Sequence, residues 1–242
     1  MTSMPTIISL SNPKSPEAEA YRTLRTNLQF STVDHELQTL LVTSSNASEG
    51  KTTTICNLAV SFAQIGKKVL IIDGDLRRPR LHTYLNVSNV KGLSNVLTHQ
   101  ATLEEAMKET VLDIQVLTCG PIPPNPSELL NSNRLKQLLV ELKSQFDIIL
   151  IDTPPVGVVT DAAILSTLVD GTLIVVASHQ TESDQAVRAM KLLNNVGARI
   201  LGSVLTKVPA DRKGYYGYQY YEYTQEHESK KRTRRLKKAK AR

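Results

Sequence analysis

A ten-residue stretch, SSNASEGKTT (44–53), carries the residue types that hold a nucleotide phosphate. Gly50, Lys51 and Thr52 fit the end of the pattern G-x-x-x-x-G-K-[ST], while Ser45 stands in place of its first glycine. In this pattern backbone N–H groups surround the phosphates, the lysine reaches the β- and γ-oxygens, and the hydroxyl faces Mg²⁺. The alternative is an ordinary Ser/Gly turn that caps a helix. The expected nucleotide contacts are Ala47, Ser48, Glu49, Gly50, Lys51, Thr52 and Thr53.

Three carboxylates follow apolar segments that have the character of strands. Asp73 and Asp75 end VLIIDGD, and Asp152 ends IILID. Ligands of an open α/β sheet bind outside the carboxyl ends of its strands, so all three acids can converge beside Lys51. The alternative for Asp75 is a D-x-D turn that caps the following helix. The set of three favours a site for a metal ion and a γ-phosphate.

Six of the eight tyrosines lie in GYYGYQYYEY (214–223), a stretch without aliphatic residues. A core segment would space its aromatics among aliphatics at a strand or helix period, and this stretch does not. Three interpretations stay open at this point: phosphorylation substrates, a self-associating low-complexity tail, or tyrosines that stack on single-stranded nucleic acid. The last is disfavoured because the sequence shows no folded groove for a nucleic acid. The tyrosines are Tyr215, Tyr216, Tyr218, Tyr220, Tyr221 and Tyr223.

These residues need a scaffold, and the apolar pattern predicts one. Continuously apolar strands alternate with helical patterns, which predicts an α/β fold with a doubly wound, mostly parallel sheet covered on both faces. Two short helical patterns are expected between the second and third strands. The expected strands are 39–44, 68–73, 113–118, 146–152, 172–178 and 198–207. The expected helices are 16–30, 51–65, 133–146, 161–168 and 183–197.

Composition limits the class of protein. The chain has 242 residues with 40% hydrophobic residues and a net charge of +6. Residues 229–242 hold nine Lys/Arg and no acid, which leaves 20 basic and 23 acidic residues and a net charge of −3 elsewhere. No apolar run reaches the ~18 residues of a membrane span, no secretory signal is evident, and two cysteines make no disulfide framework. We expect a cytoplasmic protein.

Together these motifs resemble known P-loop proteins. SSNASEGKTT resembles a Walker A motif, LIIDGDLR the D-x-D-x-R of a Walker A′ motif, and IILIDTPP a Walker B motif. The three together are typical of the deviant P-loop ATPases, which include partitioning and division-site ATPases that act as switches. Those proteins usually carry a signature lysine early in the loop, where this chain has Asn46. That branch is therefore the alternative and not the main interpretation.

The sequence is more similar to the bacterial tyrosine kinases, in the form whose kinase domain is separate from its membrane activator. EAYRTLRTN (19–27) resembles their E-x-x-R-x-x-R motif, and GPIPPNPSELL (120–130) a loop of that family. The tyrosine cluster resembles their autophosphorylation tail. The resemblance runs from about Pro13 to that cluster.

The resemblance implies an ATP- and Mg²⁺-dependent protein-tyrosine autokinase that regulates capsular or exopolysaccharide synthesis. Asp73 would be the general base, while Asp75 and Asp152 hold Mg²⁺ with Thr52. Phosphorylation of the tyrosine cluster would occur in trans within a ring-shaped homo-oligomer.

The resemblance also implies partners. These are the cytoplasmic segment of a membrane activator of the chain-length-regulator type and a cognate tyrosine phosphatase. Glu19, Arg22 and Arg25 would contact the neighbouring subunit; the alternative is a solvated helix face with an ion pair.

Four segments summarise the expected organisation. Residues 1–35 carry the oligomerisation helix, 36–208 the P-loop kinase domain, 209–228 the tyrosine cluster, and 229–242 a basic disordered tail. The basic tail is either a solvated arm or a contact to the anionic inner leaflet of the membrane, which would recruit the protein to the inner face of the plasma membrane.

Overall fold

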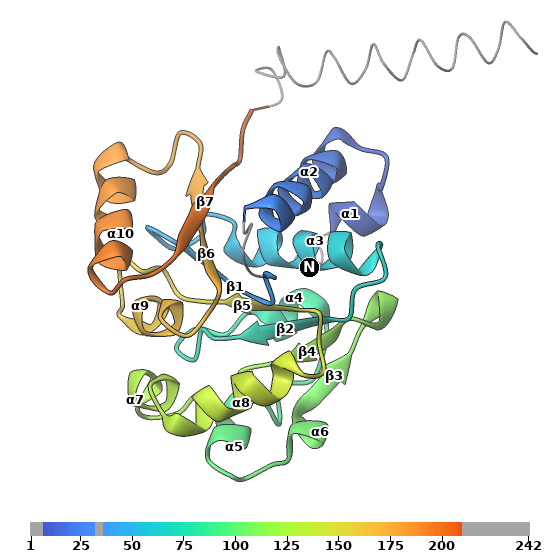
Figure 1. The fold of residues 1–242 in the computed structure, drawn as a ribbon, viewed down its shortest axis with the longest axis vertical. Helices are drawn as coiled ribbons and strands as arrows, with labels where there is room; N and C mark the ends of the chain where they lie inside the picture. The colour runs from blue at the N-terminus through green and yellow to red at the C-terminus, as the bar shows by residue number, and fades with distance from the viewer. Residues whose placement is uncertain (1–6, 32–35, 210–242) are drawn as a thin grey trace, which may run out of the picture. The chain divides into compact units, whose positions relative to one another are not determined.

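A seven-stranded sheet forms the centre of the fold (Figure 1). The structure is a computed structural model that describes residues 7–31 and 36–209. The strand order is β3-β4-β2-β5-β1-β6-β7, and every pair is parallel except β3–β4. The predicted doubly wound, mostly parallel sheet is confirmed. The strands are β1 (Thr39–Ser44), β2 (Val69–Asp73), β3 (Met107–Glu109), β4 (Gln115–Leu117), β5 (Ile148–Asp152), β6 (Gly171–Ala177) and β7 (Ile200–Thr206).

Helices cover both faces of the sheet (Figure 1). α2 and α3 pack together on one face, and α8 and α5 belong to the core of the other face. The helices are α1 (Ile8–Ser11), α2 (Pro16–Phe30), α3 (Lys51–Ala63), α4 (Leu81–Leu85), α5 (Leu93–Leu97), α6 (Leu103–Ala106), the 3-10 turn η1 (Val111–Asp113), α7 (Pro126–Leu130), α8 (Asn133–Lys143), α9 (Asp161–Ser166) and α10 (Ser183–Asn195).

The central strands are apolar on both faces because each face has its own core. In β1, Leu40 and Val42 belong to the core that includes α3, while Leu41 between them belongs to the core that includes α8. Successive residues of a strand point to opposite faces, so a strand covered on both sides does not alternate between buried and exposed positions. The continuous run TLLVTS is the result, and all six of its residues are buried.

The segment between β2 and β4 differs from the prediction. Two short helical patterns are expected there, and the structure has three short helices, α4, α5 and α6, followed by the antiparallel strand β3. β3 has three residues, none of them fully buried, so it carries no hydrophobic pattern that would reveal it. The other predicted elements are found with their ends shifted by a few residues.

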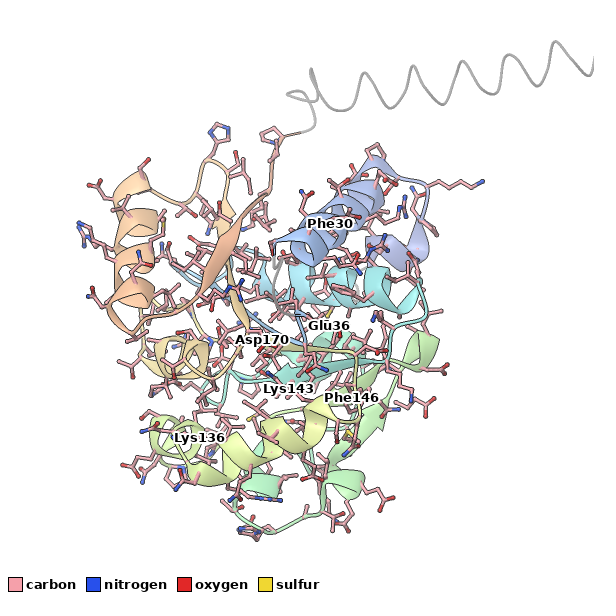
Figure 2. The ribbon with its side chains drawn as sticks, viewed as in Figure 1. Phe30, Glu36, Lys136, Lys143, Phe146 and Asp170 are labelled. Atoms are coloured by element: carbon pink, nitrogen blue, oxygen red, sulfur yellow. The ribbon has the colours of Figure 1, made fainter. Side chains whose placement is uncertain are left out.

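The amino ends of the strands are closed by a polar network around Asp170, which precedes β6. Lys143, at the end of α8, approaches the Asp170 carboxylate to 2.7 Å (Figure 2). The other carboxylate oxygen accepts hydrogen bonds from the backbone N–H groups of Gln38 and Thr39 at 3.1 and 2.8 Å. These contacts fix α8, β1 and β6 at the edge opposite to the predicted site, because ligands bind at the carboxyl ends.

Contacts along the chain divide it after Lys207. Residues 1–207 form one unit, in which α2 packs on α3, and residues 208–242 form a second. The tyrosine cluster and the basic segment lie outside the described residues. None of the described helices is long and apolar enough to cross a membrane.

Candidate active site

The loop between β1 and α3 forms an open cradle of backbone groups. It begins after Ser44 and ends at Gly50, whose φ of 99° lies in the left-handed region that favours glycine. The Lys51 ammonium donates to the Ser44 hydroxyl at 3.0 Å, so it reaches back across the loop. The sequence therefore folds as the phosphate-loop pattern predicts, with the first turn of α3 facing the cradle.

Thr52 and Asp152 meet at the carboxyl end of the sheet. The Thr52 hydroxyl donates to Asp152 Oδ2 at 2.5 Å, while Asp152 Oδ1 is buried and has no hydrogen-bond partner among the described residues. Burial raises the pKa of Asp152 from its usual 3.8 to about 6; the Thr52 hydrogen bond and the Lys51 charge oppose this, and Asp75 adds to it. An orphaned buried carboxylate oxygen is costly and is suited to a cation.

Lys51 carries the complementary charge. Burial lowers its pKa, while the negative charges of Asp152, Asp75 and Glu49 oppose that shift. A half-buried ammonium is stabilised by carboxylates close to it. Bound phosphates would add negative charge on the open side of the same lysine.

The two acids of the D-x-D segment have different surroundings. Asp73 pairs in register with Asp152 on the neighbouring strand and is fully buried. Its two oxygens accept hydrogen bonds from the backbone N–H groups of Asp75 and Leu81, each at 3.2 Å. Burial, with the Asp152 and Asp75 charges, raises the pKa of Asp73 well above its usual value. Asp75 is partly exposed and accepts from the backbone N–H groups of Arg77 and Arg78 at 3.2 and 2.9 Å.

A pocket of about 560 Å³ lies above these groups. Asp75 and Asp152 line it and Asp73 does not. Of the predicted nucleotide contacts, six line the pocket: Ala47, Ser48, Gly50, Lys51, Thr52 and Thr53.

The seventh, Glu49, turns its side chain into the protein, where it is fully buried. There it accepts from the Asn46 backbone N–H at 3.1 Å and the Thr181 hydroxyl at 2.6 Å. Glu49 therefore does not line the pocket, and its side chain holds the loop in shape.

The structure adds residues that the sequence did not identify. Arg77 lines the pocket and forms a bidentate pair with the fully buried Asp161, at 2.8 and 3.0 Å. Lys207 also lines the pocket and donates to the Ser48 carbonyl and to Gln180 Oε1, both at 2.6 Å. The arginine of D-x-D-x-R was a usable signal for Arg77. No sequence pattern identified Lys207, because it lies 159 residues after Ser48, the loop residue that it contacts.

The residues present fit a metal that arrives with a nucleotide. The described residues contain no cluster of three or more His, Cys, Asp or Glu side chains able to hold a metal alone. Mg²⁺ commonly uses one or two protein ligands and takes the rest from water and phosphate oxygens. The unpartnered Asp152 oxygen beside the Thr52 hydroxyl matches that donor set.

The predicted oligomerisation residues lie on α2, away from the pocket. Arg22 pairs with Glu19 at 2.5 Å, and its guanidinium also donates to the Pro13 carbonyl at 2.9 Å. Arg25 donates to the Ser61 carbonyl on α3 at 2.7 Å. The ion pair within the helix, which the sequence analysis gave as the alternative, is present between Arg22 and Glu19. The contact to a neighbouring subunit stays a prediction. The six predicted phosphoacceptor tyrosines lie outside the described residues.

Comparisons with known proteins identify the family. A family model described as an AAA domain matches residues 37–200. The "Tyrosine-protein kinase YwqD" of Bacillus subtilis (strain 168) is 42% identical over 213 residues, 88% of this chain and 90% of that protein. The chain belongs to the bacterial tyrosine kinase family. It is thus a tyrosine-protein kinase, as the motifs predicted.

Two further comparisons support that family. The crystal structure of the chimerical protein CapA2B2 matches with a TM-score of 0.81 and 40% identity over 84% of this chain and 90% of that one. The "Tyrosine-protein kinase wzc" of Salmonella typhi is 35% identical, with 93% of this chain matching 31% of that longer protein.

The positioning-ATPase alternative is a more distant relative of this kinase. The septum site-determining protein MinD of Pyrococcus horikoshii, in complex with Mg-ADP, matches with a TM-score of 0.59 and 28% identity over 69% of each chain. The shared fold explains why the three nucleotide motifs alone fit both groups, and the higher identity to the kinases decides between them.

One prediction follows from the burial of Asp152. At pH 8 without nucleotide, the free energy of unfolding of the Asp152→Asn variant should exceed that of the wild type by about 1–3 kcal/mol. The reason is that a carboxylate with a raised pKa destabilises the folded state at any pH above that pKa. The penalty is fully present above about pH 6 and absent below the unfolded-state value of 3.8, so most of the gain should be lost near pH 4. Urea unfolding at both pH values measures it. Equal or lower stability of the variant at pH 8 would contradict the account of Asp152.

Proposed function

We propose that this kinase transfers the γ-phosphoryl group of ATP to tyrosines in the tail of a second copy of the chain. The observation that carries the proposal is the pocket that Lys51, Thr52 and Asp152 line together. The proposed acceptors are the tyrosines of GYYGYQYYEY (214–223), because six of the chain's eight tyrosines are gathered there. The biological role that the family implies is regulation of capsular or exopolysaccharide synthesis and export.

Each pocket residue has a proposed part in the transfer. The backbone of the 44–50 loop orients the phosphates, and Lys51 compensates the charge that develops on the γ-phosphate. Thr52, Asp152 and Asp75 are the proposed Mg²⁺ ligands, directly or through water. When bound, Mg²⁺ neutralises phosphate charge and fixes the orientation of the β- and γ-phosphates.

A tyrosine hydroxyl has a pKa near ~10 and needs a base as it attacks. Asp73 is the base that the family resemblance suggests, and its raised pKa would suit a proton acceptor once deprotonated. Its position argues for a competing assignment, because both its oxygens bind backbone N–H groups and Asp75, not Asp73, lines the pocket. Asp73 and Asp75 are therefore the two candidate bases.

Three proposals concern the assembly. A ring-shaped homo-oligomer would bring each tail to a neighbour's active site, with Glu19, Arg22 and Arg25 at the contact. The activator would be the cytoplasmic segment of a membrane protein. About two-thirds of the wzc relative lies outside the match. Phosphorylation that is no faster with a bound activator segment than without it would remove the activator proposal.

Two proposals concern reversal and localisation. A tyrosine phosphatase would reset the tail, since several phosphates of −1.5 to −2 charges each repel one another. Tail phosphates that persist in cells after a chase would count against this partner.

The nine basic residues of 229–242 would attract the anionic inner leaflet, by about 1 kcal/mol each before screening by salt. Unchanged binding to phosphatidylserine vesicles after removal of 229–242 would exclude that contact.

The first prediction tests the transfer itself. With Mg-ATP and an activator segment, the wild-type chain should gain several phosphates on Tyr215–Tyr223. The Lys51→Met variant should lose at least roughly a hundredfold in rate, because the phosphate charge loses its counter-charge. Intact mass spectrometry with site mapping measures both. ATP hydrolysis without phosphotyrosine, although the activator binds, would favour a nucleotide switch instead.

The second prediction separates the two candidate bases. Asp75→Asn should slow phosphorylation by roughly 10²–10⁴-fold whether Asp75 binds Mg²⁺ or takes the proton. If Asp73 is the base, Asp73→Asn should cause a similar loss with ATP affinity unchanged. Single-turnover rates at saturating Mg-ATP make the comparison, and nucleotide binding is the control for folding. Full activity of Asp73→Asn would refute Asp73 as the base.

The third prediction tests the ring. Arg22→Ala combined with Arg25→Ala should give monomers, and Lys14→Ala is a matched control on an exposed lysine just before α2. Light scattering coupled to size exclusion reads the mass of each. If the double variant assembles as the wild type does, α2 does not carry the contact.

A further inference from the structure

A second pocket adjoins the nucleotide pocket. Its volume is about 670 Å³, and it is more open to solvent than the nucleotide pocket. Arg78 and Arg80 line both pockets, so the two spaces meet at these side chains. The remaining lining residues are Pro79, His82, Asn89, Gly120, Pro121 and Ile122.

The second pocket carries positive charge without any acid. Arg78 and Arg80 are exposed, and neither guanidinium has a hydrogen bond or ion pair to a residue in the described ranges. The neighbouring Arg77, by contrast, forms a bidentate pair with the buried Asp161. His82 adds a buried Nδ1 that also lacks a hydrogen-bond partner in the described chain. Two free guanidinium groups at one rim form the type of site that binds a phosphate bidentately.

The part of the lining at residues 120–122 is apolar and is held in place by hydrogen bonds. Asn89 Nδ2 donates to the Gly120 carbonyl at 3.0 Å, and the Gly120 N–H donates to Asn89 Oδ1 at 2.8 Å. A Cβ at Gly92 would lie 2.2 Å from the Gly120 nitrogen, so only glycine allows this close approach of the two segments. The wall presents Pro121 and Ile122, and Ile122 is 60% exposed.

An anionic group joined to an apolar body would complement both parts of this lining. We propose that the pocket of Arg78, Arg80 and Ile122 is a phosphotyrosine subsite for the tail of a second copy of the chain. The phosphate contacts the two guanidinium groups, and the ring lies against Ile122 and Pro121. The proposal rests on the proposed function, because that function supplies the phosphotyrosine.

The spacing of the acceptors suits such a subsite. Tyr218, Tyr220, Tyr221 and Tyr223 are one to five residues apart, so a tail with one phosphorylated tyrosine keeps others within a short distance of the active site. A residue already modified would then hold the tail while a neighbour is phosphorylated. Arg-based sites are a common means of recognising phosphorylated segments. The expected consequence is that later phosphates are added faster than the first.

The binding test uses the full chain with its six cluster tyrosines changed to Phe, saturated with a non-hydrolysable ATP analogue and Mg²⁺. The probes are labelled peptides of residues 212–226, unmodified or phosphorylated at Tyr223, read by fluorescence anisotropy. The phosphorylated peptide should bind at least about tenfold more tightly, a 1.4 kcal/mol difference. A third peptide with Tyr223→Glu distinguishes phosphate recognition from general attraction to acidic charge.

Three variants of that chain locate the contact. Arg78→Gln with Arg80→Gln should remove the preference for the phosphorylated peptide, and Ile122→Glu should do so without altering the nucleotide pocket, which Ile122 does not line. Arg188→Gln changes an exposed arginine on α10 and should keep the preference. A preference retained in both pocket variants, or equal binding of all three peptides to the parent chain, would overturn the subsite.

A separate readout distinguishes failure of the subsite from failure of the proposed function. The wild-type chain with activator and Mg-ATP is followed by the time course of its phosphorylated species. Later phosphates added faster than the first support the subsite. Tail phosphorylation with equal rates for every phosphate leaves the autokinase intact and contradicts the subsite. No phosphotyrosine at all contradicts the autokinase itself.

Discussion

The structure depends on keeping charge buried at the carboxyl ends of β1, β2 and β5. Asp152 is almost fully buried and directs one oxygen to the Thr52 hydroxyl, while Lys51 supplies the nearby positive charge. Burial of such groups is unfavourable unless they are paired and hydrogen-bonded. The arrangement is incomplete in the isolated chain, because Asp152 Oδ1 has no partner among the described residues. We propose that a nucleotide with its cation completes it, which would link the cost in stability to the capacity for binding.

The sheet order produces this juxtaposition. β5 lies between β1 and β2, and Val42 and Asp73 each pair in register with Asp152. The loop after β1 and the D-x-D turn after β2 therefore open on either side of one carboxylate. Two long-range contacts then hold the phosphate loop from outside: the buried Glu49 accepts from Thr181, and Lys207 donates to Ser48. Thr206, the last residue of β7, also donates to the Glu49 carbonyl at 2.6 Å, so the end of this strand is in direct contact with the loop.

Much of the fold and site could be predicted from local sequence. Strands covered on both faces are uninterrupted apolar runs, and Gly50-Lys51-Thr52 is a pattern with a definite local geometry. β3 could not be predicted, since it is short, exposed at the sheet edge and without apolar alternation. The side-chain direction of Glu49 could not be predicted either, because its partner Thr181 is 132 residues away. The Arg77–Asp161 pair and the second pocket likewise arise from contacts between distant segments.

The family assignment and the site have different foundations. High identity to tyrosine-protein kinases settles the class of enzyme, while the roles of individual residues follow from their burial and contacts. The same three nucleotide motifs occur in a fold shared with a division-site ATPase, so they alone do not specify a kinase. Arg78 and Arg80 follow the D-x-D segment and have no side-chain partner among the described residues, and we propose that acceptor recognition takes place there, outside the phosphate loop.

The central claim is that Asp152 and Thr52 form the protein's part of a cation site that is completed with the nucleotide. Isothermal titration of ADP with and without Mg²⁺ tests it most directly. Mg²⁺ should tighten ADP binding to the wild type by at least about tenfold, or 1.4 kcal/mol. Asp152→Asn and Thr52→Val should lose that increment and keep the Mg²⁺-free affinity. An Mg²⁺ increment that is unchanged in both variants would contradict the account.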